Sequence, residues 1–189
     1  MVVMNQVASK LTLQEFLNLP LSDDRYELVD GELIAKMAPT TPHSRTQKRL
    51  LRFLDDWCEQ TLAGEVNPEW AVALKRQGID WSPVPDLTYI SRERIPDNWD
   101  GEGVCPGIPS LVVEIISPGQ TFGQMTQKAT DYLQTLVDRV WVVDTQDRSV
   151  TIFQRDSLPQ TIWSDGTIED PLLPGLVLPV SRLFTKRGE

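Results

Sequence analysis

Apolar and polar residues alternate along several short segments of the chain, a pattern that is typical of β-strands. The clearest case is residues 25–37, where two alternating arms flank Asp30-Gly31, a favoured pair for a two-residue hairpin turn. Pairing across that turn sets Glu27 opposite Ile34. The pattern therefore predicts a β-hairpin near the N-terminus.

Other segments show apolar runs of strand length. They lie at residues 69–75, 84–90, 111–117, 139–145 and 149–155. A loop rich in Pro and Gly, residues 95–109, separates the second of these strands from the third. The last two strands flank a short polar turn, so we expect them to pair as a hairpin.

Apolar residues recur at helical spacing in three further segments. These are residues 11–20, 40–64 and 122–137. We expect Thr41 to cap the longest helix and Gly64 to end it. Its apolar stripe, extended backward at the same period, passes through Gln47 and His43. The order of helices and strands predicts an α/β or α+β fold with a mixed sheet.

The size of the chain fits one domain with a proper core, because 189 residues would be crowded as two. We expect this domain at residues 11–189, after a loose segment at residues 1–10. The N-terminus lacks the pattern of a secretory signal, and no apolar run is long enough to span a membrane. The two cysteines, Cys58 and Cys105, form no metal-binding motif, which favours a reduced, cytoplasmic protein.

The formal net charge of −9 argues against a general nucleic-acid coat, which would be basic. It leaves room for an enzyme that meets phosphates through a local basic patch, or one whose acidic site binds a divalent ion. His43 is the single histidine, so a multi-histidine metal site is excluded. A Gly-rich phosphate loop is also absent from the sequence.

Two carboxylates interrupt strands that are otherwise apolar: Asp86 in VPDLTYI and Glu114 in LVVEIISP. A buried carboxylate needs a cation, hydrogen bonds or a metal. If the two strands are neighbours, both acids meet, which suggests a shared proton or a divalent cation. Ligands that are all oxygen favour Mg²⁺ or Mn²⁺. Lys128 lies on the apolar stripe of the last helix, so we expect it to pair with one of these acids.

In this order the motifs resemble the PD-(D/E)XK nuclease superfamily and, more closely, the Uma-two family of restriction-like endonucleases. The matching segments are YELVDGELI, PHSRTQKRLL, PDLTYISRER, LVVEIISP, the helix with Lys128 and Tyr132, RVWVVD and LPGLVLP. They cover residues 11–184. The resemblance implies a restriction-endonuclease-like fold, in which helices flank a mixed β-sheet that follows an N-terminal hairpin.

The resemblance also implies roles for individual residues. Asp86 and Glu114 would bind the metal together with the carbonyl oxygen of Ile115. Lys128 would serve as the superfamily lysine, although the usual E-x-K position is occupied here by Ile116. We expect Lys128 to orient the attacking water or to stabilise charge on the phosphate, since two nearby acids oppose its loss of a proton.

Three further positions belong to the predicted site. Glu27 is the candidate further acid and would support the metal or the lysine. His43 would contact the phosphate or one of the acids. Gln124 stands where the family often has an acid, so that contact is expected to differ.

Two functions follow from these observations. The first is a Mg²⁺- or Mn²⁺-dependent endonuclease that hydrolyses DNA, acts as a homodimer and needs no membrane. The second is a catalytically inactive nuclease-fold protein that serves as a binding or regulatory module. In that case Glu114 and Lys128 form a structural salt bridge, backbone amides satisfy Asp86, and His43 and Glu27 are ordinary helix and hairpin residues.

Overall fold

The computed structural model describes residues 10–19 and 25–184. The loose segment expected at residues 1–10 lies outside this part of the chain, apart from Lys10. The described helices are α1 (Leu13–Leu17), α2 (Thr41–Thr61), the short 3-10 helix η1 (Arg92–Arg94), α3 (Phe122–Gln134) and α4 (Ser181–Phe184). The described strands are β1 (Tyr26–Val29), β2 (Glu32–Ala35), β3 (Gly64–Pro68), β4 (Leu74–Arg76), β5 (Ile79–Trp81), β6 (Leu87–Ser91), β7 (Leu111–Ile115), β8 (Arg139–Asp144), β9 (Ser149–Gln154), β10 (Gln160–Trp163), β11 (Thr167–Ile168) and β12 (Leu178–Pro179).

Six strands form the central sheet, in the order β10-β9-β8-β7-β6-β3. The strands β7 and β8 run parallel, and each other neighbouring pair is antiparallel. A parallel pair needs a crossover connection, which α3 supplies. The mixed sheet flanked by helices that the sequence predicts is confirmed.

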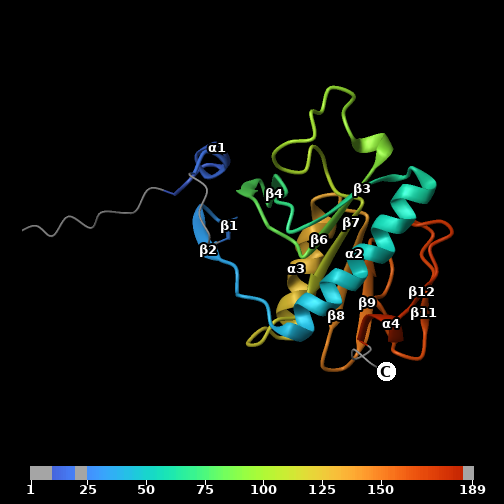
Figure 1. Cartoon of the computed structure of the whole chain (residues 1–189). Coiled ribbons are helices and arrows are strands. Elements are labelled where there is room, and N and C mark those ends of the chain that lie inside the picture. Colours follow the sequence, from blue (N-terminus) through green and yellow to red (C-terminus); the bar gives the residue numbers. More distant parts are fainter. Residues whose placement is uncertain (1–9, 20–24, 185–189) are drawn as a thin grey trace, which may run out of the picture.

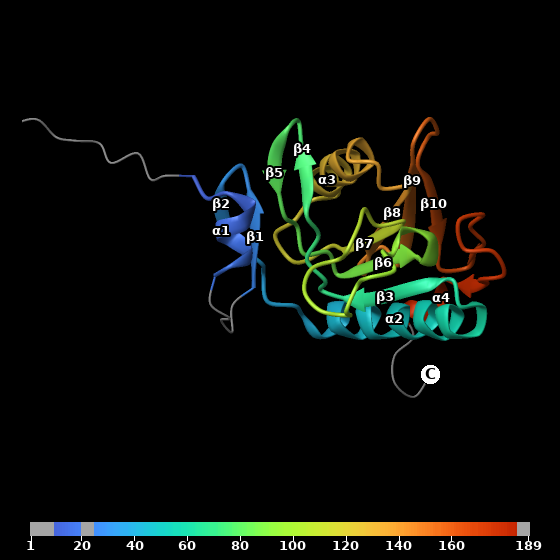
Figure 2. The ribbon, with the colours of Figure 1, turned by 90° about the horizontal axis from the view of Figure 1, so that it is seen from above.

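The two long helices lie on opposite faces of this sheet, with α2 along one face and α3 along the other (Figure 2). Leu87 and Val113 belong to the core on the α2 side. Val112 and Val140 belong to the core on the α3 side. Because successive strand residues point to opposite faces, Glu114 lies on the α3 face.

The N-terminal hairpin of β1 and β2 lies with α1 beside the sheet (Figure 1). Its register is the predicted one, with Glu27 opposite Ile34. Thr12 caps α1 through a capping box with Glu15.

Contacts on two sides fix the hairpin to the body of the molecule. Leu28 and Ser82 exchange two backbone hydrogen bonds of 3.0 Å. The guanidinium of Arg76, on β4, donates to Asp30 in the hairpin turn at 2.7 Å and to Asp131 on α3 at 3.2 Å. The hairpin is therefore held in a defined place relative to α3.

The C-terminal segment packs against the α2 face of the sheet. Leu173, Leu178 and Leu183 are completely buried there. Asp170 anchors the segment, since its carboxylate accepts two hydrogen bonds of 2.8 Å from the guanidinium of Arg139.

The predicted ends of α2 are wrong by one to two residues. Thr40, and not Thr41, is the N-cap, and its hydroxyl accepts from the backbone N–H of His43. At the other end the left-handed residue is Leu62, with φ 55°, in place of Gly64. Gly64 instead begins β3, where a side chain would collide with the backbone of the neighbouring strand β6.

The strand predicted at residues 69–75 forms only at its last two residues, which belong to β4. The sheet is continued by β3, which ends at Pro68, and Glu69 then takes a left-handed conformation with φ 49°. The following residues run irregularly, with Val72 donating to the carbonyl of Pro83, until β4 begins. The apolar spacing of residues 69–73 reflects burial without regular strand pairing.

Candidate active site

Asp86 lies at the centre of a network of charged side chains. It directly precedes β6, after two prolines that lack the N–H groups needed for a strand ladder, so the predicted strand at 84–90 begins later than expected. Its Oδ1 accepts from Lys36 Nζ at 2.8 Å. Its Oδ2 accepts from the backbone N–H of Ile115 at 2.6 Å and lies 3.1 Å from His43 Nε2. An ionised carboxylate only accepts, so Nε2 donates.

Glu114 lies on β7, next to Asp86. The antiparallel register pairs Leu87 with Val113, so the next pair outward brings Asp86 and Glu114 opposite each other. The Oε1 atom of Glu114 accepts from the hydroxyl of Tyr132 at 2.7 Å and contacts Lys128 Nζ at 3.0 Å. The neighbouring strands and the lysine from α3 therefore meet as the sequence predicts.

Lys128 bridges two acids from distant parts of the chain. Besides Glu114, its Nζ contacts Oε1 and Oε2 of Glu27 at 3.0 and 3.3 Å. Glu27 also accepts from the backbone N–H of Val84 at 3.0 Å. The hairpin thus supplies one carboxylate to the network and holds the segment that leads into Asp86.

His43 and Gln47 bring the start of α2 to the same point. Gln47 Nε2 donates to the backbone carbonyl of Asp86 at 2.9 Å, one helical turn after His43. The other ring nitrogen of His43, Nδ1, is buried without a hydrogen-bond partner in the described structure. The ring is therefore held through Nε2 alone, by its hydrogen bond to Asp86.

The pKa of Asp86 reflects two opposing effects. Burial raises it, but the hydrogen bond from His43 and the charge of Lys36 outweigh burial and hold the pKa below its ordinary value. Asp86 is therefore ionised at neutral pH and available to a cation.

The pKa values of the partners across the network also shift. Burial lowers the pKa of Lys128, but Glu114 and Glu27 outweigh it and raise the pKa above the ordinary value of 10.5. Burial raises the pKa of Glu114, which Lys128 opposes and Asp86 reinforces. Burial, followed by the charge of Glu114, raises the pKa of Tyr132 well above its ordinary value. Lys128 is therefore a cation and Tyr132 a neutral donor.

The network has a buried floor and a partly open rim. Asp86 and Glu114 are 2% and 6% exposed. The side chains of Glu27, Lys36 and Lys128 are 13%, 18% and 19% exposed. Solvent therefore reaches the network at Glu27, Lys36 and Lys128, which the hairpin and α3 supply.

All five predicted side chains, Glu27, His43, Asp86, Glu114 and Lys128, belong to this one network. Their chemical roles stay predictions. In the described part of the chain, no three His, Cys, Asp or Glu side chains form a group arranged to hold a metal ion.

The sequence pattern does not predict two of the contacts in the network. Lys36 alternates onto the hairpin face of Glu27, but no local pattern pairs it with Asp86. Tyr132 belongs to one of the matching motifs, and the motif does not predict its hydrogen bond to Glu114. Gln124 caps α3 through a capping box with Thr121, so its side chain serves the helix end.

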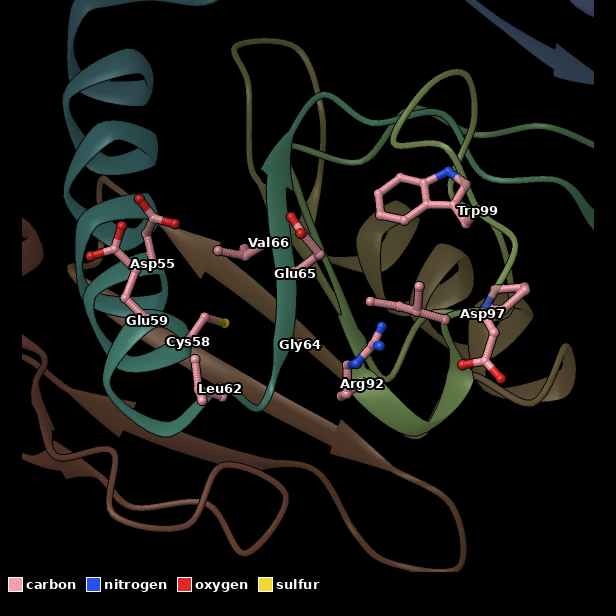
Figure 3. A pocket seen from close by; sticks show the side chains of 12 residues that line it. Asp55, Cys58, Glu59, Leu62, Gly64, Glu65, Val66, Arg92, Asp97 and Trp99 are labelled. Atoms are coloured by element: carbon pink, nitrogen blue, oxygen red, sulfur yellow. The ribbon is translucent and has the colours of Figure 1, made fainter.

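A hollow lies away from this network, between the end of α2, β3 and the loop after η1 (Figure 3). Its volume is about 700 Å³, and no predicted site residue lines it. Acids dominate its wall. The charged residues that line it are Asp55, Glu59, Glu65, Asp97 and Arg92. Such a wall repels phosphates.

The thiol in that hollow is not a reactive nucleophile. Burial, with the charges of Asp55 and Glu65, raises the pKa of Cys58 to about 12. Cys58 is 5% exposed and packs in the core. The charged network around Asp86 is therefore the better candidate for chemistry.

A comparison with protein-family models matches residues 13–181 to the Uma2 family, described as "Putative restriction endonuclease". The chain belongs to the Uma2 family. The resemblance seen in the sequence motifs is thereby confirmed, and the network described above lies within the matched residues of this Uma2 protein.

Among solved structures, the Uma2 chain is similar to one titled "Crystal structure of a putative nuclease belonging to DUF820 from Anabaena variabilis ATCC 29413". The two are 24% identical, and the match covers 92% of this chain and 97% of the other, with a TM-score of 0.80. At this identity the likeness establishes the nuclease-like fold alone. A search of the curated proteins gave no match. Within the described residues, none of the helices of this Uma2 protein has the length and apolarity needed to cross a membrane.

Proposed function

We propose that this protein is a divalent-metal-dependent endonuclease that hydrolyses phosphodiester bonds in DNA. The observation that carries the proposal is the meeting of Asp86, Glu114 and Lys128, which come from two adjacent strands and the following helix. Family membership supports it, since the family is described as a restriction endonuclease. The catalytic roles given below belong to the proposal.

The donor set suits a hard divalent cation such as Mg²⁺ or Mn²⁺. Asp86 and Glu114 offer carboxylate oxygens, the ligands that these ions prefer. The ammonium of Lys36, 2.8 Å from Asp86 Oδ1, already marks a position where a cation is held. Asp86 and Glu114 would bind the metal at that position.

The backbone of Ile115 is placed to assist. Its N–H donates to Asp86 at 2.6 Å. In a strand the N–H and C=O of one residue point to the same edge, so the carbonyl of Ile115 faces the side of the sheet on which Asp86 lies. This supports Ile115 as the third ligand.

Lys128 would stabilise charge in the reaction. A bound divalent ion would supply Lewis-acid activation of the phosphodiester and of the attacking water. Because its pKa is raised, Lys128 keeps its proton and serves as a hydrogen-bond donor that holds the water or the phosphate oxygen. Glu27 would position Lys128, and His43 would fix the carboxylate of Asp86 through Nε2.

The first half of α2 offers a contact surface for the DNA backbone. Arg45, Lys48, Arg49 and Arg52 recur at helical spacing and share one side of the helix. This placement opposes the helix dipole, which favours cations at the C-terminal end, so helix stability does not account for it. Within an acidic chain, these four residues, the α2 basic stripe, form a local patch complementary to phosphates. Arg45, Lys48 and Arg52 are exposed, whereas Arg49 is half-buried and donates to the carbonyl of Leu183 at 3.1 Å.

One observation favours the alternative of an inactive binding or regulatory module. Each acid of the network already has a cation: Lys36 for Asp86, and Lys128 for both Glu27 and Glu114. A network satisfied in this way is stable without metal. On this alternative the protein binds its partner and leaves DNA intact.

Incubation with supercoiled plasmid and Mg²⁺ or Mn²⁺ tests the proposal. We expect the wild type to nick or linearise the plasmid, and Asp86→Asn to lower the rate at least about 100-fold, because the metal loses a charged ligand. Asp97→Asn, the same change in an exposed loop, is the matched control and should leave the rate unchanged. Cleavage that persists in Asp86→Asn would refute the named site, and binding without any cleavage by the wild type would favour the module.

A further inference from the structure

Lys36, like Glu27, comes from the N-terminal hairpin and not from the central sheet or the two long helices. It follows β2 and reaches Asp86 from the hairpin, with 2.8 Å between Nζ and Oδ1. Its side chain is 18% exposed, whereas that of Asp86 is 2% exposed. A long side chain at a partly open rim can leave without unfolding its surroundings.

Lys36 contacts Oδ1 of Asp86, and this is the oxygen through which Asp86 would bind a metal ion. The other oxygen of Asp86, Oδ2, already accepts hydrogen bonds from His43 and from the backbone N–H of Ile115. An ammonium and a divalent cation cannot share Oδ1, because like charges at so short a distance repel strongly. Metal binding at Asp86 therefore requires Lys36 to move.

The charges of the network agree with such an exchange. The ammonium of Lys36 contacts Asp86, and that of Lys128 contacts both Glu27 and Glu114. A divalent ion that replaces Lys36 keeps a cation at Asp86. An ion added beside Lys36 would place two cations against one buried carboxylate, which is unfavourable.

We propose that Lys36 is a built-in counter-ion that occupies the metal position at Asp86 and is exchanged for the divalent ion. The proposal rests on the proposed function, because it takes Asp86 as a metal ligand. Without metal, Lys36 keeps the buried carboxylates compensated. With metal, its ammonium moves toward solvent at the rim, on the side from which a phosphate would approach.

The test is the affinity of the full-length protein for Mn²⁺, measured by titration calorimetry without DNA. Lys36→Met keeps the length of the side chain and removes the competing charge, so we expect it to bind Mn²⁺ at least about tenfold more tightly than the wild type. Lys75→Met is the matched control. It removes one charge from an exposed lysine on β4 and should change the affinity less than about twofold.

Thermal unfolding supplies a second measurement that does not depend on activity. Without metal, Lys36→Met should unfold at a lower temperature than the wild type, because Asp86 loses its cation. Saturating Mn²⁺ should then raise its unfolding temperature by more than it raises that of the wild type. If Lys36→Met does not fold, Lys36→Gln takes its place in both measurements.

The outcomes separate the exchange from the proposed function. An affinity of Lys36→Met equal to or weaker than that of the control would overturn the exchange and show a purely structural salt bridge. If the wild type still cleaves DNA in a manner that depends on Mn²⁺ and Asp86, the proposed function survives that result. If neither the wild type nor Lys36→Met binds Mn²⁺, both the exchange and the metal site fall.

Discussion

At the scale of single residues, the position of Lys128 decides what it can do in a reaction. Its Nζ lies 3.0 Å from both Glu27 and Glu114, and these acids raise its pKa. A general base at neutral pH needs a lowered pKa, so Lys128 is suited to donating hydrogen bonds and stabilising negative charge.

Replacing Lys128 tests whether its side chain keeps its proton at neutral pH. We expect Lys128→Met to lower the free energy of unfolding by about 3–5 kcal/mol, because two partly buried acids lose their cation. A lysine whose pKa is raised on folding stabilises fully below its ordinary pKa of 10.5, and that contribution is lost as pH rises through the folded pKa. The difference between wild type and variant should therefore not shrink between about pH 7 and about pH 9.

Urea unfolding at several pH values provides this measurement. An increase with pH of the difference in unfolding free energy also agrees with the account, because ionising the buried Glu114 is more unfavourable when Lys128 is absent. A difference that shrinks over this range would show Lys128 giving up its proton near neutral pH, and would restore it as a candidate base. Lys75→Met is the control, because its side chain is 72% exposed and its loss should change stability by less than about 1 kcal/mol.

The limits of sequence reasoning are clearest for Lys36. Asp86 and Glu114 stand out because a charge within an apolar strand demands a partner. Lys36 follows a hairpin arm whose neighbours are largely exposed, so nothing in its local pattern marks it as a partner of Asp86, fifty positions away. Only the docking of the hairpin, through Leu28 and Ser82, brings the two together.

At the scale of elements, α2 serves both the core and the site. Its inner side carries His43 and Gln47 to Asp86 and then packs Leu50 and Leu54 into the core. Its outer side carries the α2 basic stripe. A single helix thus joins the proposed DNA contact to the candidate active site.

The α2 basic stripe makes a prediction about DNA binding. We expect Lys48→Gln/Arg52→Gln to weaken binding to a labelled duplex and to lower the slope of log affinity against log salt by about 1–2, as phosphate contacts are lost. Fluorescence anisotropy in the presence of a chelator measures binding without cleavage.

The control for this pair is Lys75→Gln/Arg155→Gln, which removes the same number of charges from β4 and from beyond β9. Both residues already pair with acids, Asp80 and Asp138. If the two double variants weaken binding equally, net charge and not the stripe governs binding, and the proposed contact surface is wrong.

The sequence predicted the elements with the strongest periodicity and failed where pairing depends on the fold. The hairpin register, α3 and the strands around Glu114 follow from alternation and helical spacing. Residues 69–75 alternate as a strand would, yet the left-handed Glu69 and the pairing of Gly64–Pro68 with β6 could not be read from local pattern. The hairpin of β4 and β5 was missed too, although Gln77-Gly78 is a turn signal.

At the scale of the whole molecule, the fold explains why residues so far apart in sequence meet. The antiparallel pairing of β6 and β7 joins Asp86 to Glu114, and the parallel crossover to β8 lays α3 over Glu114. The docked hairpin and the start of α2 then close the network. The order of motifs in the sequence signals this arrangement, because each motif is one contributor to a single site.

The same scale sets the scope of the functional conclusion. The Uma2 family and the nuclease-like fold are established, whereas the metal, the DNA substrate and the homodimer expected from the sequence are proposals. An acidic chain with a local basic stripe is compatible with DNA as substrate, and a symmetric pair would provide two sites for two strands.

The most direct test of the central claim is the anomalous difference density of a crystal soaked in Mn²⁺. The account predicts one strong peak within bonding distance of carboxylate oxygens of Asp86 and Glu114, with the ammonium of Lys36 moved away from Asp86. A fully soaked crystal with no peak at this position, and with Lys36 still bound to Asp86, would contradict it.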